Sequence, residues 1–211
     1  ATLNGTITVN PSPTLVLNST AATTNQSICV NTSINPISYT FGGGATGVTV
    51  SGLPTGVSSI VSGNTVTISG TPTTTTGSPF NYTLTTSGGS CGTISLSGTI
   101  TVNTAVSLVL NSSASTTNQI VCTNTNINTI SYTFGNGATG VTVTGLPTGV
   151  SHTVSGNTIT INGAPTSTTG SPFSYSISTT GGSCGTATLN GTITVNPSPT
   201  LVLNSTAATT N

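Results

Sequence analysis

Apolar and polar residues alternate strictly along short stretches of this chain. From Ile94 to Val102, apolar residues and one glycine occupy every second position, and serine or threonine fills the positions between them. Alternation with a period of two places one side of a strand against a core and the other side in water. The pattern therefore predicts a half-buried β-strand over residues 94–102, and a second copy of it over residues 187–195.

Other stretches of the chain show the same alternation. Val, Ile, Leu, Tyr and Phe stand between Thr and Ser, and Gly, Pro and Asn separate one stretch from the next. β-branched and aromatic residues favour strands, and apolar faces with the helical period of about 3.6 are rare here. The expected strands cover residues 14–18, 28–30, 37–41, 48–50, 57–61, 65–69 and 80–84. The chain is therefore predicted to be all-β.

The sequence is a tandem repeat. Cys29 recurs as Cys122 and Cys91 recurs as Cys184, both 93 positions further on, and residues 187–211 are identical to residues 1–25. The repeating unit is thus a pair of similar domains, and we expect the chain to be a segment of a longer array. The expected order is the last strand of a preceding repeat at 1–10, one repeat at 11–103, a second repeat at 104–196, and the first strand of a following repeat at 197–211.

The two junctions that open these repeats differ in sequence. Pro11 and Pro13 flank a serine before the first repeat, whereas Thr104 and Val106 flank an alanine before the second. Proline fixes the backbone in an extended form and removes a hydrogen-bond donor. We therefore expect the first linker to be short and stiff, and we expect the two linkers to differ in bend or stiffness.

Each repeat offers seven or so short strands, joined by turns at regular spacing. This arrangement is typical of an immunoglobulin-like β-sandwich. The tryptophan that fills the core of antibody domains is absent, so bulky aromatic residues on the inward side of the strands are expected to replace it. These are Tyr39, Phe41, Phe80 and Tyr82 in the first repeat and Tyr132, Phe134, Phe173 and Tyr175 in the second.

The four cysteines form one widely spaced pair in each repeat, with no CxxC motif. We interpret them as one intradomain disulfide per domain, Cys29–Cys91 and Cys122–Cys184. Closing a loop of that size would stabilise a domain by about 4 kcal/mol in the chain-entropy model. Such bridges persist outside the reducing cytosol. The alternative is that all four are buried free thiols.

The composition excludes most chemistry. The chain has no Lys, Arg, Asp or Glu, and its only histidine is His152, which Ser59 replaces in the other repeat. General acid–base catalysis needs a positioned proton-exchanging group, and a nucleophilic Ser or Thr needs a base beside it. We therefore expect no enzyme and no catalytic residue, and we interpret His152 as a solvated or edge-strand residue.

Ligands and partners are restricted in the same way. Calcium sites use several carboxylate oxygens, and structural zinc sites use four Cys or His ligands, so no metal or other cofactor is expected. Without a basic patch, nucleic acid and anionic membranes are poor partners. No apolar run of about 18 residues predicts membrane insertion.

Three motifs carry a resemblance to a known family. They are Leu53–Val57 (LPTGV), Val66–Pro72 (VTISGTP) and Gly77–Leu84 (GSPFNYTL), and similar motifs recur between Leu146 and Ile177. With its cysteine pair, the chain resembles the immunoglobulin-like, cadherin-like tandem repeats of large secreted Bacteroidota surface proteins, including gliding-type adhesins. The resemblance implies an extracellular stalk or fibre at the cell surface. It does not carry over calcium-stiffened linkers, because the acidic interdomain ligands are missing here.

Two classes of function follow. The first is a non-catalytic structural repeat of a bacterial surface fibre or adhesin stalk, with neighbouring repeats or chains as partners and with uncharged faces that associate into filaments. In a variant of it, a terminal strand such as residues 187–195 is donated into a neighbouring chain. The alternative is a binding module, in which outward threonines contact a surface glycan, ice or an abiotic surface. These threonines are Thr6, Thr8, Thr65, Thr67, Thr99 and Thr101.

Overall fold

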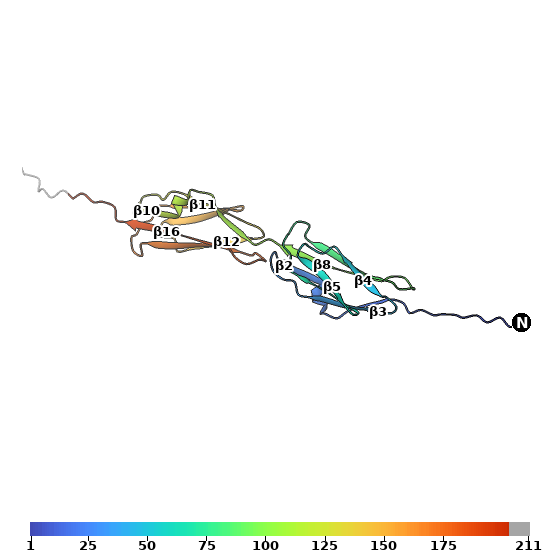
Figure 1. The fold of residues 1–211 in the computed structure, drawn as a ribbon. Helices are drawn as coiled ribbons and strands as arrows, with labels where there is room; N and C mark the ends of the chain where they lie inside the picture. Colours follow the sequence, from blue (N-terminus) through green and yellow to red (C-terminus); the bar gives the residue numbers. More distant parts are fainter. Residues whose placement is uncertain (203–211) are drawn as a thin grey trace, which may run out of the picture. The chain divides into compact units, whose positions relative to one another are not determined.

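The computed structural model describes residues 1–202. The chain forms two compact units, Ala1–Ala105 and Val106–Asn211. Each unit contains eight strands and one short 3₁₀ helix, and no α-helix occurs in the described residues (Figure 1). The all-β prediction is confirmed, and each unit is described below by itself.

The first unit is a sandwich of two four-stranded sheets. One sheet has the order β1-β3-β6-β5 and the other has the order β2-β8-β7-β4. The elements are β1 (Thr14–Leu17), η1 (Ala21–Thr24), β2 (Asn25–Cys29), β3 (Ile37–Gly42), β4 (Gly47–Ser51), β5 (Val57–Ser62), β6 (Thr65–Gly70), β7 (Phe80–Ser87) and β8 (Ser95–Asn103).

The second unit repeats this architecture. Its sheets have the orders β13-β14-β11-β9 and β10-β16-β15-β12. The elements are β9 (Ser107–Leu110), η2 (Ala114–Thr117), β10 (Asn118–Cys122), β11 (Ile130–Gly135), β12 (Gly140–Thr144), β13 (Val150–Ser155), β14 (Thr158–Gly163), β15 (Phe173–Thr180) and β16 (Thr188–Asn196).

These strand orders are those of an immunoglobulin sandwich. β1, β3, β6 and β5 take the places of strands A, B, E and D, and β4, β7 and β8 take the places of C, F and G. β2 adds a second part of the first strand, which pairs in parallel with β8, from Asn25 opposite Thr99 to Cys29 opposite Asn103. The early part of each unit is therefore bonded to its last strand.

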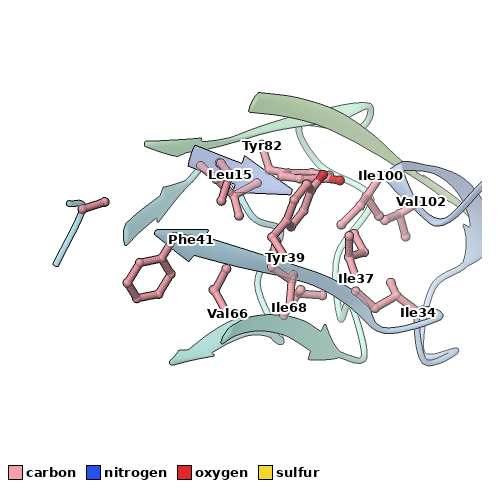
Figure 2. Close-up of a cluster of buried hydrophobic side chains, with 13 residues drawn as sticks. Leu15, Ile34, Ile37, Tyr39, Phe41, Val66, Ile68, Tyr82, Ile100 and Val102 are labelled. Atoms are coloured by element: carbon pink, nitrogen blue, oxygen red, sulfur yellow. The ribbon is translucent and has the colours of Figure 1, made fainter. Parts of the chain in front are cut away.

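The alternating residues of each strand place one side in the core. Burial follows a period of two in β3, β6, β7 and the second half of β8. Figure 2 shows apolar side chains of both sheets meeting between the layers, among them Ile37, Tyr39 and Ile100. Burial of such side chains is the main stabilising contribution to folding. Tyr39, Phe41 and Tyr82 are buried as expected, and Phe80 packs against the same core.

The structure differs from the expected elements in two places. The sequence predicts no element between residues 18 and 28, but residues 21–24 form η1 and β2 begins at Asn25. The strand expected over residues 1–10 is not formed: residues 1–13 pair with no sheet of the described chain, and Leu3, Ile7 and Val9 are almost fully exposed. The expected first strand of a following repeat at 197–211 lies largely outside the described residues.

Candidate functional site

Each unit has two poles, which lie at opposite ends of its long last strand. In the first unit, the N-terminal pole consists of three segments that lie side by side: Asn10–Pro13, Gly43–Thr46 and the loop between β7 and β8. The backbone amide of Thr46 donates to the carbonyl of Ser87 at 2.9 Å in this loop region. The C-terminal pole gathers the end of β2 and the end of β8, and the amide of Val30 donates to the carbonyl of Asn103 at 2.9 Å.

The predicted bridge between Cys29 and Cys91 is wrong. Cys91 lies at the N-terminal pole as an exposed free thiol, and its Sγ donates to the carbonyl of Asn10 at 3.2 Å. Cys29 lies at the C-terminal pole, opposite Asn103. The nine residues of β8 separate the two poles, a length of about 26 Å at the usual rise per residue. The two Cα atoms of a disulfide lie within about 7 Å of each other, so this pair is out of reach.

The predicted bridge between Cys122 and Cys184 is wrong for the same reason. Cys122 ends β10 opposite Asn196 at the C-terminal pole of the second unit, and it is a partly buried free thiol. Cys184 lies in the loop before β16, where Gly182 packs against Val106 at the opposite pole. Cys29 and Cys184 are the two cysteines that take part in disulfide bonding.

A tyrosine pair stands where immunoglobulin domains place their disulfide. That disulfide joins strands B and F across the two sheets, and the corresponding strands here, β3 and β7, carry Tyr39 and Tyr82. Figure 2 shows the two rings reaching from opposite sheets with their hydroxyl groups close together. In the second unit the hydroxyl groups of Tyr132 and Tyr175 are 3.2 Å apart. The link between the sheets is therefore a buried hydrogen bond.

Tyr82 and Tyr175 are held in their protonated form. Burial raises the pKa of Tyr82 well above its usual value, and the hydrogen bond to Tyr39 raises it further. Burial and the bond to Tyr132 act in the same direction on the pKa of Tyr175. The Tyr82 hydroxyl also donates to the carbonyl of Thr24 at 3.2 Å, which ties η1 to the core.

Gly98 makes room for the Tyr82 ring. A Cβ atom at this position would collide with the phenol ring of Tyr82 and with the carbonyl of Thr24. Gly191 has the same relation to Tyr175 and Thr117 in the second unit. A glycine on the apolar side of β8 is therefore required by the tyrosine that crosses it.

A buried glutamine fixes the chain between β2 and β3, and sequence reasoning missed it. The Gln26 side chain donates to the carbonyls of Thr23 and Asn35, both at 2.8 Å, and accepts from the Asn35 amide at 2.8 Å. Gln119 makes the matching bonds in the second unit. The available signal was a polar residue on the inward side of a strand, two positions before Ile28.

The residues that the sequence singles out as linkers precede β1 and β9. Pro11 and Thr104 are exposed, whereas Pro13 and Val106 are half-buried. Equivalent positions of the two linkers are therefore similarly exposed, although proline occurs in only one of the linkers.

The single histidine of the chain lies at the surface of the second unit. His152 is exposed on β13, an edge strand, which confirms the interpretation made from the sequence. A surface hollow in the second unit is lined by Asn126, Ile127, Thr129, Asn162 and Gly163, none of which is ionisable. Within residues 1–202, no group of three or more His, Cys, Asp or Glu side chains could hold a metal ion. No helix in that part of the chain is long and apolar enough to cross a membrane.

Four of the six outward threonines lie on central strands, and one of these four bonds to a neighbouring side chain. Thr65 and Thr67 are on β6, and Thr99 and Thr101 are on β8, all half-buried. Thr99 donates to the Asn81 side chain at 3.0 Å. On the same sheet the hydroxyl groups of Thr85 and Ser95 are 2.9 Å apart. Thr6 and Thr8 fall in the stretch before β1 that forms no strand.

Comparisons with known proteins identify the fold. No protein-family model matches the chain, and no curated protein matches it. The chain is similar in structure to the insect immune protein hemolin, with 17% identity, a TM-score of 0.55, and coverage of 89% of this chain and 48% of that one. It is also similar to the D1–D2 fragment of Rst, with 10% identity, a TM-score of 0.53, and coverage of 86% and 99%. The two immunoglobulin domains IG1 and IG2 of DIP-gamma give 9% identity, a TM-score of 0.50, and coverage of 89% and 99%.

The chain thus consists of tandem immunoglobulin-like β-sandwiches. The strand orders and the structural neighbours agree on this class of fold. At such low identity the neighbours show the fold alone, so function has to be argued from the residues of this chain.

Proposed function

We propose that this chain is a non-catalytic structural repeat of an extracellular bacterial surface fibre or adhesin stalk. The observation that carries the proposal is the parallel pairing of β2 with β8, repeated by β10 with β16. It connects the early part of each unit to the strand by which the chain leaves that unit. Tandem units connected in this way are suited to transmit tension.

The direction of the strands explains why. β1 and β8 both run from the N-terminal pole towards the C-terminal pole, so a pull on the two ends of a unit acts along the axes of both strands. The five β2–β8 pairs and the six β7–β8 pairs are then loaded together, in shear. Bonds that share a load in this way resist more force than bonds that open one after another.

The composition supports an inert and self-associating material. Without ionisable groups other than one histidine, four tyrosines and four cysteines, the side chains offer little for catalysis or for charged ligands. An uncharged surface also lacks the repulsion that normally keeps proteins apart. The hemolin structure carries implications for homophilic adhesion of that protein, and homophilic contact is the kind of association that we propose here.

Imaging of the cell surface tests the proposal. Immunogold labelling and electron microscopy with an antibody against the chain should show thin extracellular fibres with a bead for each unit. Chelation of calcium should change neither the fibre length nor the melting temperature, because the chain has no Asp or Glu. Labelling confined to the cytoplasm, or fibres that shorten in chelator, would overturn it.

The glycan- or ice-binding alternative has its own test. Its basis is the hydroxyl-rich outer sheet face of β7 and β8, but several of these hydroxyl groups already bond to one another or to Asn81. A glycan array and an assay of ice recrystallisation should both be negative for the purified chain. A dose-dependent signal in either assay would support the alternative.

A further inference from the structure

The two poles of each unit carry one cysteine each. In the first unit Cys91 lies at the N-terminal pole and Cys29 at the C-terminal pole. In the second unit Cys184 and Cys122 take the same two places. Because the last strand separates the poles of each unit, the two cysteines of one unit cannot bridge each other.

One asparagine relates the cysteines of successive units. Cys91 bonds to the carbonyl of Asn10, and the residues that correspond to this pair 93 positions later are Cys184 and Asn103. Asn103 is also the residue that lies opposite Cys29 in the β2–β8 ladder. By this equivalence, we expect Cys184 of the second unit to approach Asn103. Asn103 already lies opposite Cys29 of the first unit.

The length of the junction permits this approach. Only three residues, Thr104–Val106, lie between the end of β8 and the start of β9. A chain of that length reaches at most about 14 Å from Asn103 to Ser107. The start of β9 therefore follows Asn103, the residue opposite Cys29, after a short covalent linker.

We propose that a disulfide crosses every junction of the array and joins the cysteine at the end of β2 in one unit to the cysteine of the last loop in the next. Within this chain the pair is Cys29 and Cys184, the two cysteines that take part in disulfide bonding. Cys122 bonds in the same way to the Cys91 of a following repeat. The free thiols of Cys91 and Cys122 are thus left for the same bond with a preceding repeat and with a following repeat, respectively.

The reaction is a thiol–disulfide exchange with an external disulfide. The thiolate of one cysteine attacks the external disulfide, forms a mixed disulfide and releases one thiol. The second cysteine, as thiolate, then attacks the protein sulfur of the mixed disulfide and releases the other thiol. Two protein thiols lose two electrons and two protons in total, and the external disulfide is reduced to two thiols.

These junction disulfides stiffen the linkers between units, as bound calcium does in linkers that carry acidic residues. Each junction is connected twice, by the three-residue linker and by the sulfur–sulfur bond, so the bending between units is restricted. The restriction depends on oxidation and not on a metal ion. Reduction therefore releases the junctions and leaves each sandwich folded.

A longer chain tests the rule. The protein is extended at its C-terminus by a second copy of residues 26–103, which continues the repeat because residues 187–211 are identical to residues 1–25. It is oxidised in a glutathione buffer, its remaining thiols are blocked with N-ethylmaleimide, and it is digested with pepsin, because trypsin has no Lys or Arg site. Mass spectrometry should find Cys29 linked to Cys184, and Cys122 linked to the added copy's Cys91. The maleimide should be on Cys91 and on the added copy's Cys29.

Single serine variants provide matched controls. C29S should free Cys184 for maleimide and leave the Cys122 link intact, and C122S should do the reverse. Circular dichroism of the variants should match that of the parent, because none of these cysteines bridges its own sandwich. A Cys29–Cys91 or Cys122–Cys184 peptide, maleimide on all cysteines after oxidation, or loss of both links in C29S would overturn the proposal.

Discussion

Single uncharged residues of this chain form long-range polar contacts of the kind that charged groups form in other proteins. Gln26 satisfies three backbone groups where the chain crosses from β2 to β3. The phenol of Tyr82 reaches the backbone of Thr24 over Gly98, which has no side chain to obstruct it. Amide and hydroxyl groups thus take over the long-range polar connections, and every buried side-chain nitrogen or oxygen within residues 1–202 has a hydrogen-bond partner.

Removal of the Gln26 side chain should destabilise the first unit. Gln26→Ala removes the part-buried hydrogen bonds of the Asn35 amide and of the Thr23 and Asn35 carbonyls, so the free energy of unfolding should fall by about 2–4 kcal/mol. Denaturant unfolding followed by circular dichroism measures it. Asn25→Ala, at the exposed neighbouring position, is the control, with a change within about 0.5 kcal/mol. Equal effects of the two variants would show that the buried amide contributes nothing special.

At the scale of strands and turns, most of the fold could be predicted from the sequence. The strands expected at 57–61 and 65–69 form the hairpin of β5 and β6, with Ser62 paired to Thr65 across Gly63 and Asn64. The turn after Leu53 closes with the Val57 amide donating to the Pro54 carbonyl at 3.0 Å. Both depend on local geometry, which a period of two and well-placed glycine and proline residues determine.

The cysteine pairing could not be predicted in the same way. Spacing along the chain does not reveal that Cys29 ends a strand parallel to β8 whereas Cys91 precedes that strand, because parallel pairing of β2 is a long-range contact. The sequence pattern of η1 is also hidden, since residues 21–24 have neither an apolar face nor a charged cap. Long-range register, and not local pattern, was the missing information.

Edge strand β5 offers an apolar edge for contact between chains. It exposes Ile60 and Val61, by 64% and 48%, at the edge of its sheet. Natural edge strands usually carry a lysine or another charge that blocks pairing with a second sheet. The corresponding strand β13 exposes Val154 in the second unit. The edges of this molecule lack that protection.

A charge on this edge should weaken self-association. Ile60→Lys should lower the light scattering of concentrated solutions without lowering the melting temperature, since the side chain is mostly exposed. Thr76→Lys, which adds the same charge in the exposed loop before β7, should have a smaller effect. Equal scattering from both variants would mean that net charge alone, and not the strand edge, governs association.

The whole molecule is unusual in having almost nothing to titrate below neutral pH. It has no Asp or Glu and one exposed histidine. Acid unfolding of ordinary proteins results mainly from carboxylates that are paired in the folded state. The pH dependence of this chain's stability is therefore expected at the alkaline end, where burial raises the pKa of Tyr82 and Tyr175.

Stability should be lost only in alkali. Burial raises the pKa of Tyr82 and Tyr175 in the folded state, so an unfolded chain releases their protons above about pH 10 while the folded chain keeps them. With the thiols alkylated, the free energy of unfolding should be flat in acid and should fall above pH 10 by about 1.4 kcal/mol per pH unit in each sandwich. Denaturant titrations across this range measure the slope. Tyr82→Phe with Tyr175→Phe should flatten it, and an unchanged slope would contradict the assignment.

The hydrogen-bonded tyrosine pairs have a practical consequence. Because hydroxyl groups and not sulfur atoms connect the two layers of each sandwich, the polypeptide needs no oxidising enzyme in order to acquire its tertiary structure. It can be produced in the reducing interior of an expression host and recovered in native form. Cross-linking can then be started at a time that the experimenter chooses.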